Sequence, residues 1–180
     1  MNKLSQYLII NDKEKVNNIN IGKPFPLGSS LTSQGVNFSL VATNAEYVEI
    51  LLFEKEDSIA PKNILKLDQS HNTGPYWHVE IKYLNEGCIY AFRIKQKNNQ
   101  INNNYEKKVL LDPCARGITG WGIYKREKAL KTQENTSSCL KSVVCDRKLF
   151  NFKDYPRPKH SWEETIIYEL HIKSFTAATD

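Results

Sequence analysis

Residues 35–40 of this chain read GVNFSL, residues 47–53 YVEILLF, residues 77–82 WHVEIK and residues 89–95 IYAFRIK. In the first, third and fourth runs the side chains alternate in type or face with a period of two, as in a half-buried strand. The second run is rich in β-branched and aromatic residues, which favour strands. Residues 64–67 add a shorter candidate, so this part of the chain predicts five strands.

Turn-forming residues separate these runs, at positions 43–44 (TN), 72–75 (NTGP) and 85–87 (NEG). Short strands at this spacing, with no helical pattern between them, favour an antiparallel sandwich. Each of Trp77, Tyr90 and Phe92 can bury about 150–250 Å² and would dominate the core. The sequence therefore predicts an N-terminal extension at residues 1–20 and an immunoglobulin-like β-sandwich at residues 21–97.

The periodic pattern weakens after residue 97. Residues 98–104 form an Asn-rich tract (NNQINNN) that predicts an exposed loop. Residues 142–146 are a short strand candidate, and the prolines of residues 155–158 (YPRP) stiffen the chain by fixing φ. We expect an irregular linker over residues 98–160.

The last segment, residues 161–180, contains a second kind of signal. Residues 165–172 read TIIYELHI, a strongly β-prone run that has no candidate partner strand after it. Leaving its large apolar side chains in water would forfeit about 1.5–3 kcal/mol each. We interpret this run as a lone strand whose partners would follow further along a longer chain.

Composition and charge exclude several classes of protein. Of the 180 residues in the chain, 40% are hydrophobic. A complete eight-stranded α/β barrel needs about 250 residues, so this chain is too short to contain one. Its net charge of +5 is scattered, which argues against nucleic-acid binding. The sequence predicts no signal peptide, no membrane span and no membrane partner, and therefore a cytoplasmic protein. The four cysteines and four histidines show no metal-ligand spacing, so we expect no metal and no cofactor.

Five motifs, in order, carry a resemblance to a known family: GKPFPLG at 22–28, GVNFS at 35–39, WHV at 77–79, LLDPCAR at 110–116 and WEETIIYELHIKSFT at 162–176. Together they resemble the N-terminal region of isoamylase-type glycogen and starch debranching enzymes. Two positions depart from the family pattern, because Cys114 stands where Tyr is usual and Ser174 where Gly is usual.

The resemblance implies a sandwich of carbohydrate-binding module family 48 followed by a glycoside hydrolase family 13 barrel. Residues 166–172 would be the first strand of that (β/α)8 barrel, here truncated. The family hydrolyses α-1,6 branch linkages in glycogen or amylopectin with retention, using two carboxylates on later barrel strands. No catalytic residue is therefore assigned in this chain, which we expect to be inactive alone.

Three tryptophans, Tyr168 and Cys114 are the candidate site residues. Trp77 could stack on a glucose ring, but its phase within 77–81 also suits a core position. Trp121, between two glycines, could be a sugar platform or could pack on the barrel. Trp162, Tyr168 and Cys114 are predicted to pack between domains.

Three functions remain open at this stage. The chain could be the N-terminal portion of a debranching enzyme, with α-glucan and the catalytic barrel as its partners. It could also be a freestanding α-glucan-binding module. The third possibility is a sandwich that binds another protein, which would then cover the terminal β-prone run.

Overall fold

A computed structural model describes residues 18–97, 107–146 and 159–177 of the chain. The chain divides into two units, Met1–Arg147 and Lys148–Asp180, and each is described by itself. The Asn-rich tract, the YPRP segment and residues 1–17 lie outside the described residues.

The first sheet of the larger unit is antiparallel, with β7 and β3 at its centre. Seven residue pairs join β3 to β7, including Phe38 opposite Val79 and Leu40 opposite Trp77. In order across the sheet, its strands are β1 (Ile19–Asn20), β7 (Tyr76–Lys82), β3 (Gly35–Val41) and β2 (Gly28–Leu31), with β6 (Asn72–Thr73) also paired to β7.

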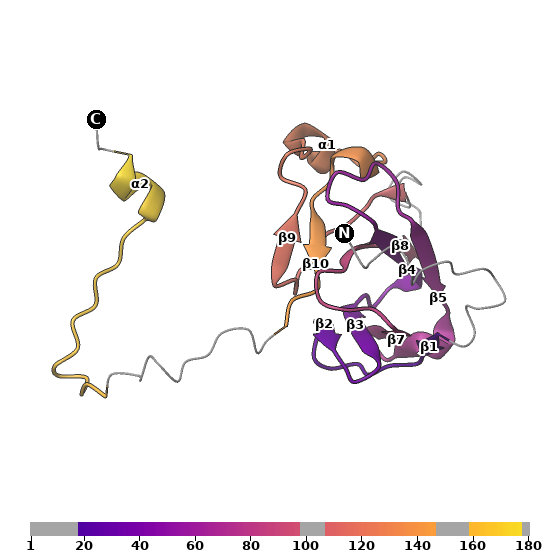
Figure 1. Cartoon of the computed structure of the whole chain (residues 1–180), viewed down its shortest axis with the longest axis horizontal. Coiled ribbons are helices and arrows are strands. Elements are labelled where there is room, and N and C mark those ends of the chain that lie inside the picture. The colour runs from indigo at the N-terminus through magenta and orange to yellow at the C-terminus, as the bar shows by residue number, and fades with distance from the viewer. Residues whose placement is uncertain (1–17, 98–106, 147–158, 178–180) are drawn as a thin grey trace. The chain divides into compact units, whose positions relative to one another are not determined.

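The second sheet is also antiparallel, and β4 and β8 form its longest pairing (Figure 1). Ile50 lies opposite Phe92 in this pair. Its strands in order are β5 (Asn63–Leu67), β4 (Ala45–Phe53), β8 (Ile89–Gln96), β10 (Lys141–Val143) and β9 (Gly117–Thr119).

Aromatic rings from both sheets meet in one core. Phe38 of β3 lies edge-to-face on Tyr90 of β8, with ring centroids 4.8 Å apart, and Tyr90 lies 5.7 Å from Phe92. All three side chains are at most 2% exposed. Because the inner residues of both sheets fill this space, the prediction of an antiparallel β-sandwich is confirmed.

The five strands predicted from periodicity and β-prone composition are all present, as β3, β4, β5, β7 and β8. The sandwich continues beyond residue 97, where the sequence analysis expected it to end. The strands β9 and β10 lie within the expected irregular linker, yet they extend the second sheet through pairing of β10 with β8. Beyond β10, Val144 is fully buried and exchanges backbone hydrogen bonds with Gly87 and Cys88. A strand of three residues is too short to show a period, and for this reason the sequence pattern missed β9.

The helical elements that the structure describes in the larger unit are short. These are α1 (Arg126–Leu130), η5 (Thr136–Ser138) and, earlier in the chain, η3 (Gln69–His71). No helix within the described residues has the length and apolar content needed to cross a membrane.

The smaller unit contains the helix α2 (Ile172–Thr176), and residues 165–171 before it form no strand. Ile166 is 94% exposed and Ile167 76% exposed. A strand needs a neighbour to pair its backbone groups, and none of the described residues supplies one here. The assignment of residues 166–172 to a barrel strand stays a prediction.

Candidate functional site

Trp77 belongs to the core. It is 2% exposed, and its indole N–H donates to the backbone oxygen of Ala42 at 3.1 Å. A ring enclosed in this way has no free face for a sugar. The structure therefore favours the core position over the sugar-contact role for Trp77.

Trp121 is instead a surface residue, 66% exposed, in the loop that follows β9. Its ring meets that of Tyr124 at 6.2 Å and 78°, an edge-to-face arrangement. Gly120 before it has φ of +92°, a conformation that glycine adopts without strain. This glycine lets the chain turn sharply out of β9 and present the Trp121 ring.

A buried lysine secures a neighbouring loop to the strand that Trp121 follows. Lys141 of β10 is fully buried, donates to the backbone oxygen of Glu56 at 2.9 Å, and lies over the Phe53 ring at 5.0 Å. Burial lowers the pKa of Lys141. The Glu56 carboxylate in turn accepts a hydrogen bond from Thr119 at 2.6 Å. These contacts join residues 53–56 to the end of β9.

The LLDP motif is held by a buried carboxylate. Asp112 accepts from the Tyr90 hydroxyl at 2.5 Å and from the Cys114 backbone N–H at 2.8 Å, and its own N–H donates to Ser142 at 3.0 Å. Burial raises the pKa of both Asp112 and Tyr90. One carboxylate oxygen thus joins this segment to β8 and the other holds the turn at Cys114, while the Asp112 N–H joins the segment to β10.

The predicted packing residues are all at the surface. Cys114 is exposed and lies beside Gly28, where an added Cβ would come within 2.8 Å of the Cys114 backbone oxygen. In the smaller unit, Trp162 is 83% and Tyr168 75% exposed. Their predicted interdomain packing stays a prediction.

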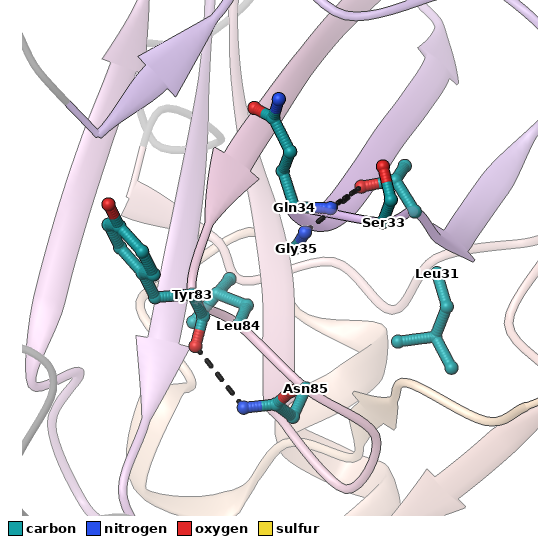
Figure 2. Close-up of a pocket in the computed structure, with 8 residues that line it drawn as sticks. Leu31, Ser33, Gln34, Gly35, Tyr83, Leu84 and Asn85 are labelled. Carbon is teal, nitrogen blue, oxygen red and sulfur yellow. Dashed lines mark hydrogen bonds between the residues drawn. The ribbon is translucent and has the colours of Figure 1, made fainter.

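A hollow that the sequence analysis did not identify lies between two turns of the larger unit (Figure 2). One turn joins β2 to β3 and the other follows β7, and the half-open space between them measures about 350 Å³. The lining residues are Leu31, Thr32, Ser33, Gln34, Gly35, Tyr83, Leu84 and Asn85. We call this feature the Tyr83 hollow.

Hydrogen bonds within and between the two turns define the Tyr83 hollow. The Thr32 hydroxyl accepts from the N–H groups of Gln34 at 3.2 Å and Gly35 at 3.0 Å. The Tyr83 backbone N–H donates to the Gln34 backbone oxygen at 2.8 Å. The Tyr83 backbone oxygen accepts from the Asn85 side-chain amide at 3.3 Å. The Asn85–Gly87 turn was visible in the sequence, but its contact with residues 32–35 depends on the β3–β7 pairing.

No group of three or more His, Cys, Asp or Glu side chains lies close enough to hold a metal ion in the part of the chain that the structure describes. Beside its charged side chains, the surface presents exposed aromatic rings, amides and hydroxyls. Such groups suit a neutral polar ligand.

The fold and these surface features define a two-sheet β-sandwich module with exposed aromatic residues. Residues 26–115 match the family model of carbohydrate-binding module 48, described as the isoamylase N-terminal domain. This match spans half of the chain, and the chain belongs to that family.

Curated relatives include two proteins named glycogen debranching enzyme. The one from Pectobacterium carotovorum is 30% identical over 167 residues, which cover 86% of this chain and 24% of the relative. The one from Cronobacter sakazakii is 31% identical over 165 residues, which cover 88% of this chain and 24% of the relative. The chain thus spans about a quarter of the length of these relatives.

Matches among solved structures include a pullulanase and a module of a virulence factor described as glycogen-degrading. A pullulanase from Bacillus acidopullulyticus matches over 67% of this chain and 12% of its own, with 16% identity and a TM-score of 0.47. The catalytic module of the pneumococcal virulence factor SpuA, in complex with an inhibitor, matches over 70% of this chain and 17% of its own, with 17% identity and a TM-score of 0.49.

Proposed function

We propose that the sandwich is the α-glucan-binding module of an isoamylase-type debranching enzyme. The observation that carries the proposal is the family match at residues 26–115, which includes β2 to β8 and the Asp112 contacts. The relatives named glycogen debranching enzyme support glycogen or amylopectin as the ligand.

In this proposal the chain itself is catalytically inert. Retaining glycosidases use two carboxyl groups about 5–5.5 Å apart that face the substrate. Asp112 is the acidic side chain that the described residues bury, and hydrogen bonds from Tyr90 and Cys114 occupy both of its oxygens. The nucleophile and the acid would belong to a barrel that completes the enzyme.

Trp121 is the proposed aromatic contact with the glucan. Its exposed ring offers a flat apolar face, and the C–H groups on one face of a glucose ring match such a surface. Tyr124 supports the ring from its edge. Aromatic rings supply large contact area at a low entropic cost, which suits a module that binds a repeating polymer.

Affinity electrophoresis tests this function. The purified chain should be retarded in a gel that contains amylopectin or glycogen, and maltooligosaccharide should restore its mobility. It should release no reducing ends from glycogen. Mobility that amylopectin leaves unchanged would refute glucan binding, and robust debranching would refute catalytic inertness.

A second candidate function is packing against a catalytic barrel. The exposure of Trp162 and Tyr168 favours it, because large apolar side chains in water usually mark a contact surface. We propose that these residues and Cys114 pack on the barrel in the complete enzyme. A hydrophobic dye should bind the full chain more strongly than a chain ending at residue 147, and equal binding would contradict this role.

A cytoplasmic location completes the proposal, since glycogen is an intracellular polymer. Fractionation of cells expressing the native gene, followed by immunoblotting, tests it. Recovery of the protein with membranes or in the medium would contradict it.

A further inference from the structure

We propose that the Tyr83 hollow binds a glucosyl unit of an α-glucan chain. This inference rests on the proposed glucan-binding function and locates a contact site within it. No residue of the Trp121 loop lines the hollow, so the two surfaces can be tested separately.

The lining of the hollow favours an uncharged ligand. None of its eight residues carries a formal charge, and five of them offer side-chain amide or hydroxyl groups, namely Thr32, Ser33, Gln34, Tyr83 and Asn85. Sugars are neutral and present many hydroxyls, whereas tight sites for phosphates and metal ions usually include charged side chains. The volume of about 350 Å³ lies at the lower end of the range of about 300–1,000 Å³ for small-molecule sites.

Hydrogen-bonding groups remain available at its rim. The Gln34 side-chain oxygen accepts weakly from Asn20 at 3.3 Å, while its NH₂ group has no partner among the described residues. The Asn85 side-chain NH₂ donates to the Tyr83 backbone oxygen. The Asn85 side-chain oxygen accepts no hydrogen bond from the residues described. One donor and one acceptor of this kind can pair with the hydroxyls of a glucose ring.

Tyr83 brings an exposed aromatic ring to the outer edge of the hollow, and its backbone is held in an unusual conformation. Its φ is +64°, the left-handed region that bulky side chains rarely adopt. Such strain persists only where surrounding contacts impose it, and it concentrates at functional sites. Here hydrogen bonds to Gln34 and Asn85 hold the residue while its side chain stays 59% exposed. Figure 2 shows the Tyr83 backbone oxygen directed toward Asn85, while the Tyr83 ring and the Gln34 amide project from the outer edge of the site.

Packing and hydrogen bonds within the chain hold the turns around Tyr83. Gly35 packs so closely on β7 that an added Cβ would lie 2.1 Å from the Ile81 oxygen. This close approach, with the Thr32 hydrogen bonds, fixes the β2–β3 turn. A preformed site loses little entropy on binding.

The test replaces Tyr83 without disturbing its backbone. Asn adopts the left-handed conformation more readily than Tyr, so Tyr83→Asn should fold normally while it removes the ring. In amylopectin affinity gels we expect its apparent Kd to rise about tenfold, equivalent to about 1.4 kcal/mol. Tyr83→Phe, which keeps the ring, should lose less. Ile59→Asn, an exposed apolar-to-Asn change outside the hollow, should bind as the wild type does.

The outcomes separate this inference from the function on which it rests. If the wild-type chain is not retarded, the proposed function itself fails. If the wild-type chain is retarded and Tyr83→Asn is retarded equally, the hollow is not a glucan site and the proposed function stands. A binding loss confined to Trp121→Ala would likewise overturn the inference. Equal thermal midpoints of the variants would show that a binding loss does not reflect unfolding.

Discussion

Tyr90 has two structural roles within a single buried side chain. Its ring packs edge-to-face on Phe38 and Phe92, and its hydroxyl donates to Asp112. The ring belongs to the inter-sheet core, whereas the hydroxyl reaches the segment that follows β8. Tyr90 therefore couples the core to the LLDP motif, which lies at the end of the family match.

Tyr90→Phe should destabilise the sandwich by about 1–3 kcal/mol, because the buried Asp112 carboxylate loses a donor while the ring packing remains. Denaturant unfolding with linear extrapolation measures the change. Tyr47→Phe is the matched control, since the Tyr47 hydroxyl makes no hydrogen bond to the described residues. A similar loss in both variants would contradict the role of the Tyr90–Asp112 bond.

Because the Cys88 thiol is buried, we expect the stability of the fold to depend on pH in the alkaline range. Burial raises its pKa from 9.0 to about 12. A raised folded-state pKa contributes stability that is complete below pH 9 and is lost as the pH rises toward 12. The free energy of unfolding of the wild type should therefore fall more steeply above pH 9 than that of Cys88→Ala.

Chemical unfolding of the two proteins at intervals from pH 8 to 11 measures this difference. A constant gap between the wild type and Cys88→Ala would show that the thiol does not couple to folding. Cys114→Ala, a cysteine-to-alanine change at an exposed position, is measured alongside for comparison.

At the scale of elements, the pairing of β3 with β7 depends on Gly35. An alanine Cβ there would meet the Ile81 oxygen at 2.1 Å, and this oxygen belongs to backbone that cannot move without disturbing the sheet. The same pairing brings the two turns of the Tyr83 hollow together. Gly35 thus links the first sheet to the proposed site.

Gly35→Ala should cost about 3 kcal/mol, because the overpacked β3–β7 ladder must shift. Thermal or denaturant unfolding measures the loss. Gly122→Ala is the matched control, since a Cβ at Gly122 meets no atom within 4 Å. Equal stability of the two variants would contradict this close packing.

At the scale of the whole molecule, the chain consists of two units that bury their side chains very differently. The larger contains both sheets and the aromatic core. In the smaller, Ile166, Ile167 and Tyr168 are each at least 75% exposed. Proteases need accessible backbone, so this contrast predicts where they will cut.

Limited chymotrypsin digestion should first cut the chain after Trp162, Tyr168 and Phe175, which are between 62% and 83% exposed. Trp77, Tyr90 and Phe92, at most 2% exposed, should be protected. Mass spectrometry of the early fragments identifies the cuts. Initial cleavage within the sandwich would contradict the division.

A chain ending at residue 147 provides the companion measurement. Because the core lies wholly within the larger unit, its thermal midpoint should match that of the full chain within about 2 °C. A larger decrease would show that residues 148–180 stabilise the sandwich.

Local pattern alone determined the β class, the five longer strands and the resemblance to debranching enzymes, because a period of two and linear motifs are properties of neighbouring residues. The tertiary structure decided the features that depend on distant contacts. The three-residue strand β9 is too short to show a period, and it pairs with β10, which in turn pairs with β8. The sequence pattern places Trp77 in a strand but does not decide whether its side chain faces the core or the solvent. The packing of the two sheets buries it. The Tyr83 hollow unites turns about 50 residues apart, so it became visible only once the β3–β7 register was known.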